Sequence, residues 1–287
     1  MKIAIFGKSG QLARELQRRA GETLDLQVFD RASADFLNPD QLLDVARALN
    51  VDAVINATAY TQVDLAETDE DRAHTINATS VGVLARVCAD KAIPLVHVST
   101  DYVFSGEGTA PWRPQDPVDP RTVYGKTKLA GEQEIALSEC QGTVLRTSWV
   151  FSAFRSNFVK TMLKLAEDHS ELKIVSDQVG GPTAAADIAD ACFTIAADMV
   201  NGAPGGTYHF SGREDVSWAG FAREIFQQSG RGPSIIEVPT TDFPRPAPRP
   251  LNSRLDCSTL EADFGIVRPD WRVGLKDVLE ELAIQSV

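Results

Sequence analysis

Tyr124 and Lys128 are the two residues whose types and spacing suggest chemistry most directly. They lie four positions apart, and residues at that spacing project from one face of a helix. A tyrosine hydroxyl, with an ordinary pKa near ~10, is a poor acid or base at neutral pH. A lysine ammonium beside it favours the phenolate and brings the pKa of the tyrosine toward the working range. The pair predicts proton transfer with a substrate, although the same spacing also arises by chance on solvated helices.

The N-terminal segment predicts a binding site for a dinucleotide. Residues 2–6 form an apolar run typical of a buried parallel strand, and Gly7 and Gly10 follow it as a turn into a helix. Such glycines let the backbone approach a pyrophosphate, which the free N–H groups of the helix N-terminus attract. Asp30 follows the next apolar stretch, where a carboxylate would accept the ribose hydroxyls of the adenosine. The alternative is a glycine turn of the kind found in any α/β protein.

The residue after Asp30 leaves the choice of cofactor open. The Asp30 carboxylate favours NADH, whereas the guanidinium of Arg31 could hold the additional phosphate of NADPH. We therefore expect NADPH or NADH as the cofactor, and use of both is compatible with this pair.

Composition points to a cytoplasmic enzyme. The chain of 287 residues carries a formal charge of −12, which argues against nucleic acid as a partner, because proteins that bind its phosphates carry basic patches. The sequence lacks an apolar run of the about 20 residues that span a bilayer, and it opens on a strand pattern rather than a signal peptide. The four cysteines and four histidines are scattered without metal-ligand spacing, so we expect free thiols and no metal site.

Strand-like and helix-like segments alternate along most of the chain, which predicts an α/β fold. We expect a Rossmann-type, doubly wound parallel sheet with a smaller C-terminal substrate-binding lobe. The expected strands are 2–6, 25–29, 52–56, 94–99, 143–147, 172–175 and 206–210. The expected helices are 11–20, 40–49, 68–90, 124–139, 156–170, 187–200, 217–229 and 274–284.

The same alternation suggests two units. We expect residues 1–148 to form the dinucleotide-binding unit and residues 149–287 to form mainly the substrate-binding lobe. The segments 172–176 and 187–211 are expected to pack back onto the first unit. The proline-rich stretch 239–250 is too irregular to extend the sheet and is assigned to the lobe.

Polar residues follow two of the expected strands. Residues 56–61 have small side chains that would let a cofactor lie against the backbone. Thr100 and its neighbours Ser99 and Asp101 follow the next strand, and a hydroxyl there could hydrogen-bond a substrate carbonyl beside the tyrosine. The alternative for these residues is a loop cap. His97 lies inside the strand pattern and is expected to support the core or the site rather than to catalyse.

These segments together resemble the extended short-chain dehydrogenase/reductase superfamily and, within it, the family of dTDP-4-dehydrorhamnose reductases. The matching segments run along almost the whole chain, at residues 7–12, 77–81, 99–104, 124–132, 146–150, 157–162, 177–183 and 249–255. The first and fourth are shared with many sugar-nucleotide enzymes. The segments 146–150, 177–183 and 249–253 are more specific to the rhamnose branch.

The resemblance implies NAD(P)H-dependent reduction of the C4 keto group of dTDP-4-dehydrorhamnose to dTDP-L-rhamnose. A nicotinamide hydride would attack the carbonyl carbon, and Tyr124 would donate the proton that the oxygen needs. Lys128 would lower the pKa of Tyr124 and bind the nicotinamide ribose, while Thr100 would orient the carbonyl. A positioned acid of this kind contributes on the order of 10²–10⁴-fold to the rate.

The resemblance also implies contacts to both ligands. Besides Tyr124 and Lys128, the residues that would contact the dinucleotide are Gly7, Gly10, Gln11, Leu12, Asp30, Arg31, Asp35, Phe36, Ala59, Tyr60, Thr61 and Val98. Those that would contact the sugar nucleotide are Thr100, Asp101 and Trp149, with Arg249 and Asn252 as candidates near its diphosphate. Plainer alternatives stay open: Trp149 as a core aromatic, Asp35 as a helix cap, and Arg249 as a surface arginine.

One departure from the family concerns magnesium. Some members bind it at a dimer interface through a glutamate early in the first helix and another three residues after the Pro-Thr of Gly-x-Pro-Thr. Glu15 matches the first, but the second position is Ala186, with acids only nearby at Asp187 and Asp190. This departure puts a bound Mg²⁺ in doubt, and the expected chemistry needs no metal. A monomer and a homodimer are both compatible with the sequence.

Two other functions stay open. A different sugar-nucleotide reductase or epimerase of the same superfamily would share the fold, and an epimerase would keep NAD tightly bound. A non-catalytic nucleotide-binding regulatory subunit would retain the fold without turnover, although the intact Thr100, Tyr124 and Lys128 argue against it.

Overall fold

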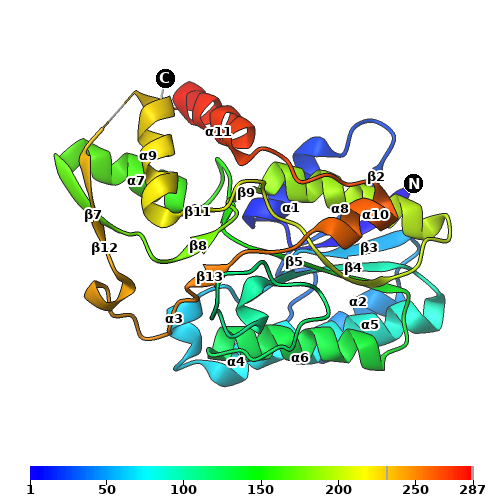
Figure 1. The fold of residues 1–287 in the computed structure, drawn as a ribbon. Helices are drawn as coiled ribbons and strands as arrows, with labels where there is room; N and C mark the ends of the chain where they lie inside the picture. The colour runs from blue at the N-terminus through cyan, green and yellow to red at the C-terminus, as the bar shows by residue number, and fades with distance from the viewer. Residues whose placement is uncertain (231, 286–287) are drawn as a thin grey trace.

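A computed structural model describes residues 1–230 and 232–285, and its framework is a six-stranded parallel sheet with helices on both faces (Figure 1). The strands are β1 (Lys2–Phe6), β2 (Asp25–Phe29), β3 (Ala53–Asn56), β4 (Leu95–Thr100), β5 (Gly142–Thr147) and β10 (Gly206–His209). They lie in the order β10-β5-β4-β3-β1-β2, and every neighbouring pair is parallel. The predicted doubly wound parallel sheet is confirmed.

The strand order places a switch point between β1 and β3. The chain moves outward from β1 to β2, then returns to the other side of β1 and continues in the opposite direction through β4 and β5. In open sheets of this kind, ligands bind outside the carboxyl ends of the strands at such a point. Two segments that the sequence analysis assigned to ligand binding, 7–10 and 56–61, start where β1 and β3 end.

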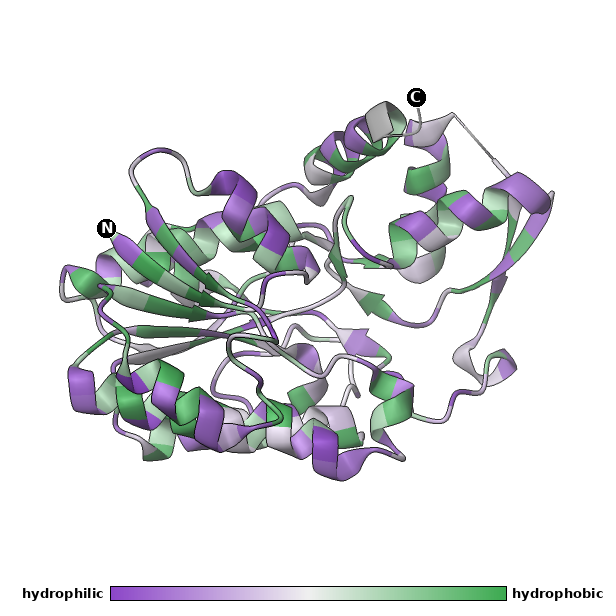
Figure 2. Cartoon of the chain, turned by 180° about the vertical axis from the view of Figure 1, so that it is seen from behind, coloured by the Kyte–Doolittle hydropathy of each residue, from purple (hydrophilic) through white to green (hydrophobic). Residues whose placement is uncertain are grey.

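The two faces of the sheet are covered by different helices. Ile3 and Ile5 of β1 pack toward α1 (Gln11–Arg19) and α8 (Ala185–Val200), whereas Ala4 and Phe6 pack toward α2 (Pro39–Arg47) and α5 (Ser80–Lys91). This alternation follows from the two-residue period of a strand. The strands of the sheet are largely apolar, and the outer surfaces of its helices are polar (Figure 2).

The segment predicted as one helix over 68–90 is instead divided into three pieces: α4 (Glu70–His74), a π-helical turn η1 (Thr75–Thr79), and α5. A separate short helix, α3 (Val63–Ala66), precedes it. Inside the turn, Asn77 accepts a hydrogen bond from the Tyr60 backbone N–H at 2.8 Å and donates to Thr127 Oγ1 at 3.1 Å. A Cβ atom on Gly131 would lie 2.0 Å from the Asn77 carbonyl oxygen. The bulge therefore lets this segment approach α6 (Val123–Leu137) closely.

A smaller lobe stands beside the carboxyl edge of the sheet (Figure 1). Its helices are α7 (Phe158–Asp168), α9 (Trp218–Ser229) and α11 (Trp271–Gln285), and its longer strands are β7 (Glu171–Val175) and β12 (Ser234–Val238). The short elements near it are β6 (Val150–Phe151), β8 (Val179–Gly180), β9 (Thr183–Ala184), β11 (Val216–Ser217), β13 (Asn252–Ser253) and the 3₁₀ turn η3 (Thr240–Asp242). Helix α10 (Ser258–Phe264) instead packs on the large sheet, and the 3₁₀ turn η2 (Asp101–Val103) follows β4.

The expected placement of 172–176 on the first unit is wrong. Strand β7 pairs in parallel with β12 in a separate two-stranded sheet, and Leu172 and Ile174 belong to the apolar core of the lobe together with Phe221 and Ile225. The edge beyond β5 is instead taken by β10, whose residues follow α8 in the chain. Segment 187–211 thus lies on the sheet, while the division of the chain near residue 149 stays a prediction.

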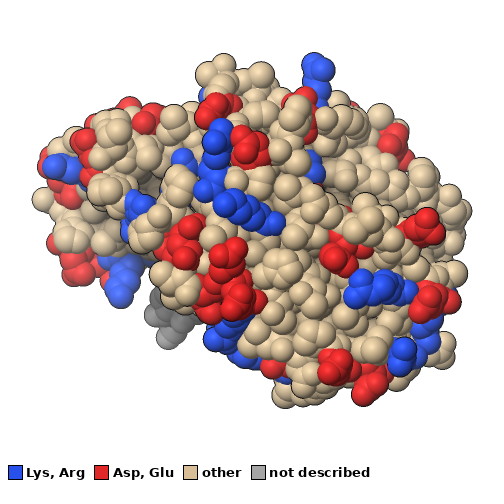
Figure 3. Space-filling view, turned by 90° about the horizontal axis from the view of Figure 1, so that it is seen from below, with Lys and Arg blue, Asp and Glu red and all other residues tan. Residues whose placement is uncertain are grey.

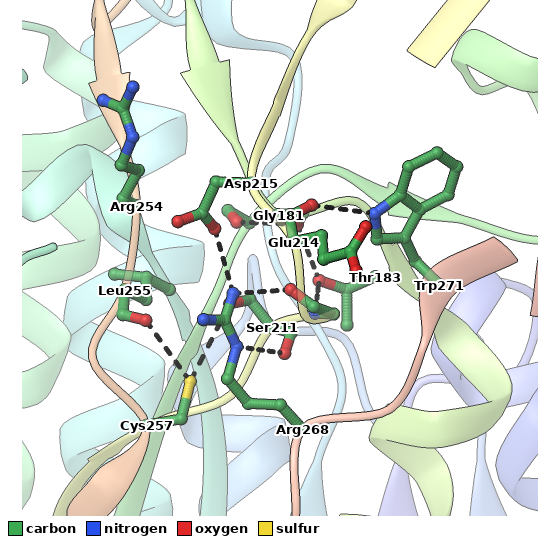
Figure 4. Close-up of polar contacts among 12 residues, drawn as sticks. Gly181, Thr183, Ser211, Glu214, Asp215, Arg254, Leu255, Cys257, Arg268 and Trp271 are labelled. Atoms are coloured by element: carbon green, nitrogen blue, oxygen red, sulfur yellow. Dashed lines mark hydrogen bonds and ion pairs between the residues drawn. The ribbon is translucent and has the colours of Figure 1, made fainter. Parts of the chain in front are cut away.

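Arg268 ties the C-terminal segment to the loop that follows β10 (Figure 4). Its guanidinium donates to the Ser211 carbonyl and hydroxyl oxygens at 3.2 Å each and to Asp215 Oδ1 at 2.9 Å. Nearby, Trp271 Nε1 donates to the Glu214 carbonyl at 2.9 Å. These contacts fix the start of α11 against the end of the sheet.

The surface is mixed in charge. On the face shown in Figure 3, acidic and basic side chains are interspersed rather than gathered into one broad basic area. Across 1–230 and 232–285, we find no helix with the length and apolar character needed to cross a membrane.

Candidate active site

Helix α6 presents three polar side chains in successive turns toward the sheet: Tyr124, Lys128 and Glu132. The helix begins after Thr122, whose Oγ1 accepts a hydrogen bond from the Gly125 N–H at 3.0 Å. A Cβ atom on Gly125 would lie 2.2 Å from the Tyr102 carbonyl oxygen, so only glycine permits this approach. The first turn of α6 is therefore held against η2, which follows the end of β4.

Lys128 is buried and its amine is held by strand β4. Its Nζ donates to the Val98 carbonyl at 2.7 Å and lies 2.9 Å from His97 Nε2. Burial lowers the pKa of Lys128 to about 8, and the negative charge of Glu132 acts in the opposite direction. A lysine with this pKa changes its charge near physiological pH, which suits a group that exchanges protons.

Tyr124 lies beside Thr100, as the sequence analysis expected. Burial raises the pKa of Tyr124 to about 12, a hydrogen bond with Thr100 acts to lower it, and the charge of Asp101 adds to the increase. The direction is opposite to the expected one, because the cost of burying a phenolate exceeds the attractions around it. The hydroxyl therefore keeps its proton at neutral pH, as an acid must. The Tyr102 ring packs edge-on against Tyr124 at 5.4 Å.

Thr100 and Asp101 form a short polar chain at the end of β4. Thr100 Oγ1 donates to Asp101 Oδ1 at 3.1 Å and accepts from the Tyr102 N–H at 3.2 Å. Both side chains are buried, and burial raises the pKa of the Asp101 carboxyl to about 6. Thr100 thus has a hydroxyl held beside Tyr124, and its one hydrogen would have to turn from Asp101 for a carbonyl oxygen to accept from it.

The turn between β1 and α1 has the geometry that a dinucleotide needs. Gly7 has φ +102°, and a Cβ atom there would lie 3.3 Å from the Ala57 carbonyl group. Gly10 precedes α1 at φ −68°, and its Cβ would point into open space. Because no side chain caps the N-terminus of α1, the N–H groups of its first turn are oriented for a phosphate. These residues fit a bound pyrophosphate.

The charged residues after β2 lie together at the surface. Asp30 Oδ1 accepts from the N–H groups of Ala32 and Ser33 at 3.1 and 3.0 Å, and its Oδ2 lies 3.5 Å from Lys8 Nζ. The bonds from Ser33 lower the pKa of Asp30. Arg31, which is exposed, lies 3.6 Å from Asp35. The Asp30 carboxylate, which favours NADH, therefore has two cations near it, Lys8 and Arg31, which favour NADPH. This arrangement leaves the choice of cofactor open.

Asp35 has a local role rather than that of a helix cap. Its Oδ1 accepts from the Leu37 N–H at 2.9 Å, whereas the cap of α2 is Asn38, whose Oδ1 accepts from the Gln41 N–H. The alternative interpretation of Asp35 as a helix cap is wrong.

Several other expected contacts to the dinucleotide have their side chains engaged elsewhere. Leu12 and Phe36 are buried in the two cores of the sheet. Gln11 Oε1 accepts from Ser152 Oγ at 3.1 Å and Asn157 Nδ2 at 2.9 Å, so it joins α1 to the lobe. The backbones of Gln11 and Leu12 still follow the turn after β1. The remaining positions lie along the carboxyl edge of the sheet at Ala59, Tyr60, Thr61 and Val98.

Trp149 stands at the junction between the sheet and the lobe. It has φ +50°, a left-handed conformation that costs energy for a bulky residue. Its ring stacks on Trp218 of the lobe, with centroids 3.6 Å apart. Its aromatic surface is therefore oriented by the lobe. Backbone strain of this kind is often found where a side chain must face a ligand.

A small cleft opens beside the first turn of α6. Its lining residues are Tyr102, Phe104, Ser105, Arg121, Thr122, Pro248, Arg249 and Pro250. Arg249 is half-buried there, donating to Asp64 Oδ2 at 2.7 Å and to the Ala247 carbonyl at 2.9 Å. It is not an isolated surface arginine. Arg121, which the sequence analysis missed, brings a second guanidinium to the cleft, where the pair could bind an anion.

Asn252 does not face this cleft. Its amide nitrogen donates to the carbonyls of Glu107 and Ala110 at 3.3 and 2.8 Å, and its Oδ1 accepts from Arg254 Nη1 at 3.0 Å. The side chain is 2% exposed and fully engaged. The amide therefore holds the loop 106–112 in place and is not available to bind the sugar nucleotide, contrary to the expectation from the sequence.

A buried ion pair below the site was also missed by the sequence analysis. Arg146 of β5 donates to Glu132 Oε2 at 2.6 Å, and Ser99 Oγ donates to Glu132 Oε1 at 2.5 Å. The pair joins α6 to β4 and β5 one turn beyond Lys128. Two features of the sequence could have indicated this pair: Arg146 lies within a family segment, and Glu132 lies four residues after Lys128 on the same helix.

Two of the acids compared with a family magnesium site, Glu15 and Asp190, have arginine partners. Glu15 is paired with Arg18 at 2.6 Å, and Asp190 is paired with Arg19. Position 186 is an alanine, and residues 1–230 and 232–285 hold no cluster of three His, Cys, Asp or Glu that could coordinate a metal. Arginines supply the positive charge at these carboxylates.

Comparisons with known proteins agree with this geometry. The model of the family described as RmlD substrate binding domain matches residues 1–284. A dTDP-4-dehydrorhamnose reductase of Escherichia coli strain K12 is 39% identical, with 98% of each chain covered. A crystal structure of a dTDP-4-dehydrorhamnose reductase from Clostridium acetobutylicum is 37% identical, has a TM-score of 0.93, and matches over 99% of this chain and 100% of that one. One from Bacillus anthracis, in complex with NADP, is 32% identical with a TM-score of 0.91, over 98% and 99%.

Proposed function

This chain belongs to the RmlD substrate binding domain family, and on that premise we propose that it reduces dTDP-4-dehydrorhamnose to dTDP-L-rhamnose with NADPH or NADH. The observation that carries the proposal is that Tyr124 and Lys128 of α6 lie beside the end of β4, where Thr100 stands at the carboxyl edge of a doubly wound sheet. The relatives described above, which match over nearly their whole length, are dTDP-4-dehydrorhamnose reductases.

Tyr124 is the proton donor in this proposal. A reduced nicotinamide, when bound, supplies the hydride that converts the C4 carbonyl into an alcohol. The oxygen then needs one proton, and Tyr124 holds one because burial keeps the pKa of its hydroxyl at about 12. Thr100 orients the carbonyl oxygen toward Tyr124 when its hydroxyl hydrogen turns from Asp101 to the substrate.

Lys128 restores the proton that Tyr124 gives up. The phenolate left on Tyr124 is costly in a buried site, which favours its rapid reprotonation. Lys128 is on the same face of α6, one turn away, and burial has lowered its pKa to about 8. Its ammonium form also offers an N–H for a ribose hydroxyl, besides the one directed at the Val98 carbonyl.

The two ligands are assigned to different places, the dinucleotide to the turn after β1 and the sugar nucleotide to the cleft beside α6. We assign the dinucleotide pyrophosphate to the N-terminus of α1, because Gly10 leaves open space there. Asp30 would hold the adenosine ribose, with Lys8 and Arg31 near enough for an additional phosphate. The diphosphate of the sugar nucleotide is assigned to Arg249 and Arg121 in the cleft.

Location and assembly are part of the same proposal. The four cysteines, Cys88, Cys140, Cys192 and Cys257, are free thiols, which supports a reducing, cytoplasmic compartment. The chain is proposed to act as a monomer or homodimer, without nucleic acid or membrane as a partner; its net charge of −12 supports the first of these exclusions.

The test is a spectrophotometric assay of reduced cofactor. Purified protein is mixed with dTDP-4-dehydrorhamnose, prepared enzymatically from dTDP-glucose, and with NADPH or NADH in parallel. We expect cofactor consumption that falls by about 10²–10⁴-fold in Tyr124→Phe, a variant that keeps the ring and loses the proton. Folded protein that binds nucleotide yet consumes neither cofactor would contradict the proposal and favour a different keto sugar or a regulatory role.

A further inference from the structure

A buried line of three polar side chains runs away from the site beneath Lys128. His97 Nε2 lies 2.9 Å from Lys128 Nζ, and His97 Nδ1 lies 3.1 Å from Asn56 Nδ2. Asn56 and His97 are register partners on β3 and β4, so their side chains emerge on the same face of the sheet. His97 and Asn56 are fully buried, so the ring nitrogens of His97 depend on these neighbouring side chains for their hydrogen bonds.

The backbone determines which way the Asn56 amide points. Asn56 Oδ1 accepts a hydrogen bond from the Thr58 N–H at 3.0 Å. An N–H of the backbone can only donate, so the amide oxygen must face Thr58 and the NH₂ group must face His97. His97 Nδ1 can then only accept.

The imidazole consequently has its hydrogen on the other nitrogen. Burial and the charge of Lys128 hold the pKa of His97 well below its ordinary value, so the ring is neutral and has one N–H. With Nδ1 accepting from Asn56, that hydrogen is on Nε2 and points at Lys128 Nζ. A neutral amine can accept this bond through its lone pair, whereas an ammonium has only hydrogens to offer.

We propose that His97 is a positioning residue for Lys128: Asn56 fixes the ring as the Nε2–H tautomer, which donates to Lys128 Nζ and favours the amine over the ammonium. The Val98 carbonyl accepts a hydrogen bond from Nζ and holds it from a second direction, on the side of α6 that also carries Tyr124. This inference deepens the proposed function, because a lysine that favours the amine form releases a proton more readily to the Tyr124 phenolate. Its kinetic test rests on the proposed function.

The other charged groups around Lys128 do not provide this bias. Glu132 on α6 favours the ammonium, and Arg146 of β5 is paired with it. Tyr124 on α6 is protonated at neutral pH, and Asp101 after β4 interacts with Thr100. On the opposite side of α6, η1 directs the neutral Asn77 toward Thr127. His97 is thus the contact that disfavours a charged lysine by hydrogen bonding.

The tautomer can be observed directly by NMR on protein labelled with ¹⁵N-histidine. Long-range ¹H–¹⁵N spectra distinguish the two neutral tautomers, and the chain has only four histidines to assign. His209 is an internal reference, because its Nδ1 lies 3.0 Å from the Trp112 carbonyl and must carry the hydrogen. We expect His97 as Nε2–H and His209 as Nδ1–H in one spectrum, with the His97 signals lost in His97→Gln. An Nδ1–H tautomer at His97 would overturn the proposal, whatever reaction the protein catalyses.

Asn56→Asp tests the link to Lys128. The aspartate keeps one oxygen for the Thr58 N–H and turns the other toward His97 Nδ1, which would move the hydrogen to Nδ1 and present an Nε2 lone pair to Lys128. The loss of reductase activity with rising pH, expected near about 8 in the native protein, should then move up by about one pH unit or more.

His209→Gln is the matched control for this shift. It replaces a buried histidine on the same sheet without contact to Lys128 and should leave the midpoint of the pH profile in place. A folded Asn56→Asp protein with an unmoved midpoint would overturn the coupling to Lys128. If Asn56→Asp does not fold, the native tautomer still decides the proposal.

Discussion

Glu132→Gln is expected to destabilise the protein far more than a change of one atom type suggests. Glu132 and Arg146 each have side chains that are 6% exposed, and the carboxylate accepts from the guanidinium at 2.6, 3.0 and 3.2 Å. The glutamine has one acceptor oxygen and directs an NH₂ group at donors of Arg146 or Ser99. Arg146 remains charged, because a guanidinium cannot be deprotonated in a protein.

The size of the effect follows from burial. Removing one partner of a buried ion pair leaves an uncompensated charge and costs about 3–5 kcal/mol. With a urea m-value of about 3 kcal/mol/M, the midpoint of unfolding should fall by roughly 1 M or more. Replacing both residues, as Glu132→Leu with Arg146→Met, should recover much of the loss, because no charge is then left without a partner. The assay is urea unfolding followed by circular dichroism.

Glu134→Gln provides the matched comparison on the same helix. Glu134 pairs with Arg86 at 2.9 Å, but the two side chains are 36% and 56% exposed. An exposed pair contributes about 0–1 kcal/mol, so this variant should unfold near the native midpoint. If Glu132→Gln and Glu134→Gln shift the midpoint equally, the reasoning from burial is refuted. A double variant that is less stable than either single variant would refute it as well.

Three further predictions concern ligand binding and the turn after β1. Asp30→Ala should raise the ratio of kcat/KM for NADPH to that for NADH by about tenfold or more, because it removes the ribose acceptor and a charge that repels phosphate; an unchanged ratio would exclude Asp30 from the site. Arg249→Ala should raise KM for the sugar nucleotide by about tenfold or more with little change in kcat, and Arg245→Ala, which removes an exposed arginine nearby, should not. Gly7→Ala should cost roughly 1–3 kcal/mol in urea unfolding, because φ is +102° and the added Cβ meets Ala57. Gly10→Ala, whose Cβ has open space, should keep its stability and instead weaken dinucleotide binding in fluorescence titrations.

The local sequence was sufficient for the elements that form the framework. The apolar runs at 2–6 and 25–29 became β1 and β2 with the predicted bounds, and the glycine turn between β1 and α1 was placed correctly. These features depend on near neighbours in the chain: alternating burial, a positive φ at Gly7, and a helix that starts at Gln11. The family segments extended this reasoning to Tyr124, Lys128 and Thr100, which the fold brings to one edge.

Long-range partners decided what the sequence left open or predicted wrongly. Strand β7 was recognisable as a strand, but its pairing with β12 depends on residues about sixty positions away. Asn252 resembles a binding residue in sequence, yet its amide is engaged by the 107–110 loop. The direction of the Tyr124 pKa shift also depended on tertiary structure, because burial outweighed the attraction that the sequence suggested.

The sequence by itself determined the doubly wound sheet, the position of its glycine turn, and the identity of the tyrosine and lysine on α6. Tertiary structure alone decided the electrostatics around that pair: the His97–Asn56 line beneath Lys128 and the Glu132–Arg146 pair one turn beyond. The physical reason is that backbone preference and hydrophobic period act over a few residues. Desolvation and hydrogen-bond partners, which set the charge of a buried group, depend on every strand and helix that surrounds it.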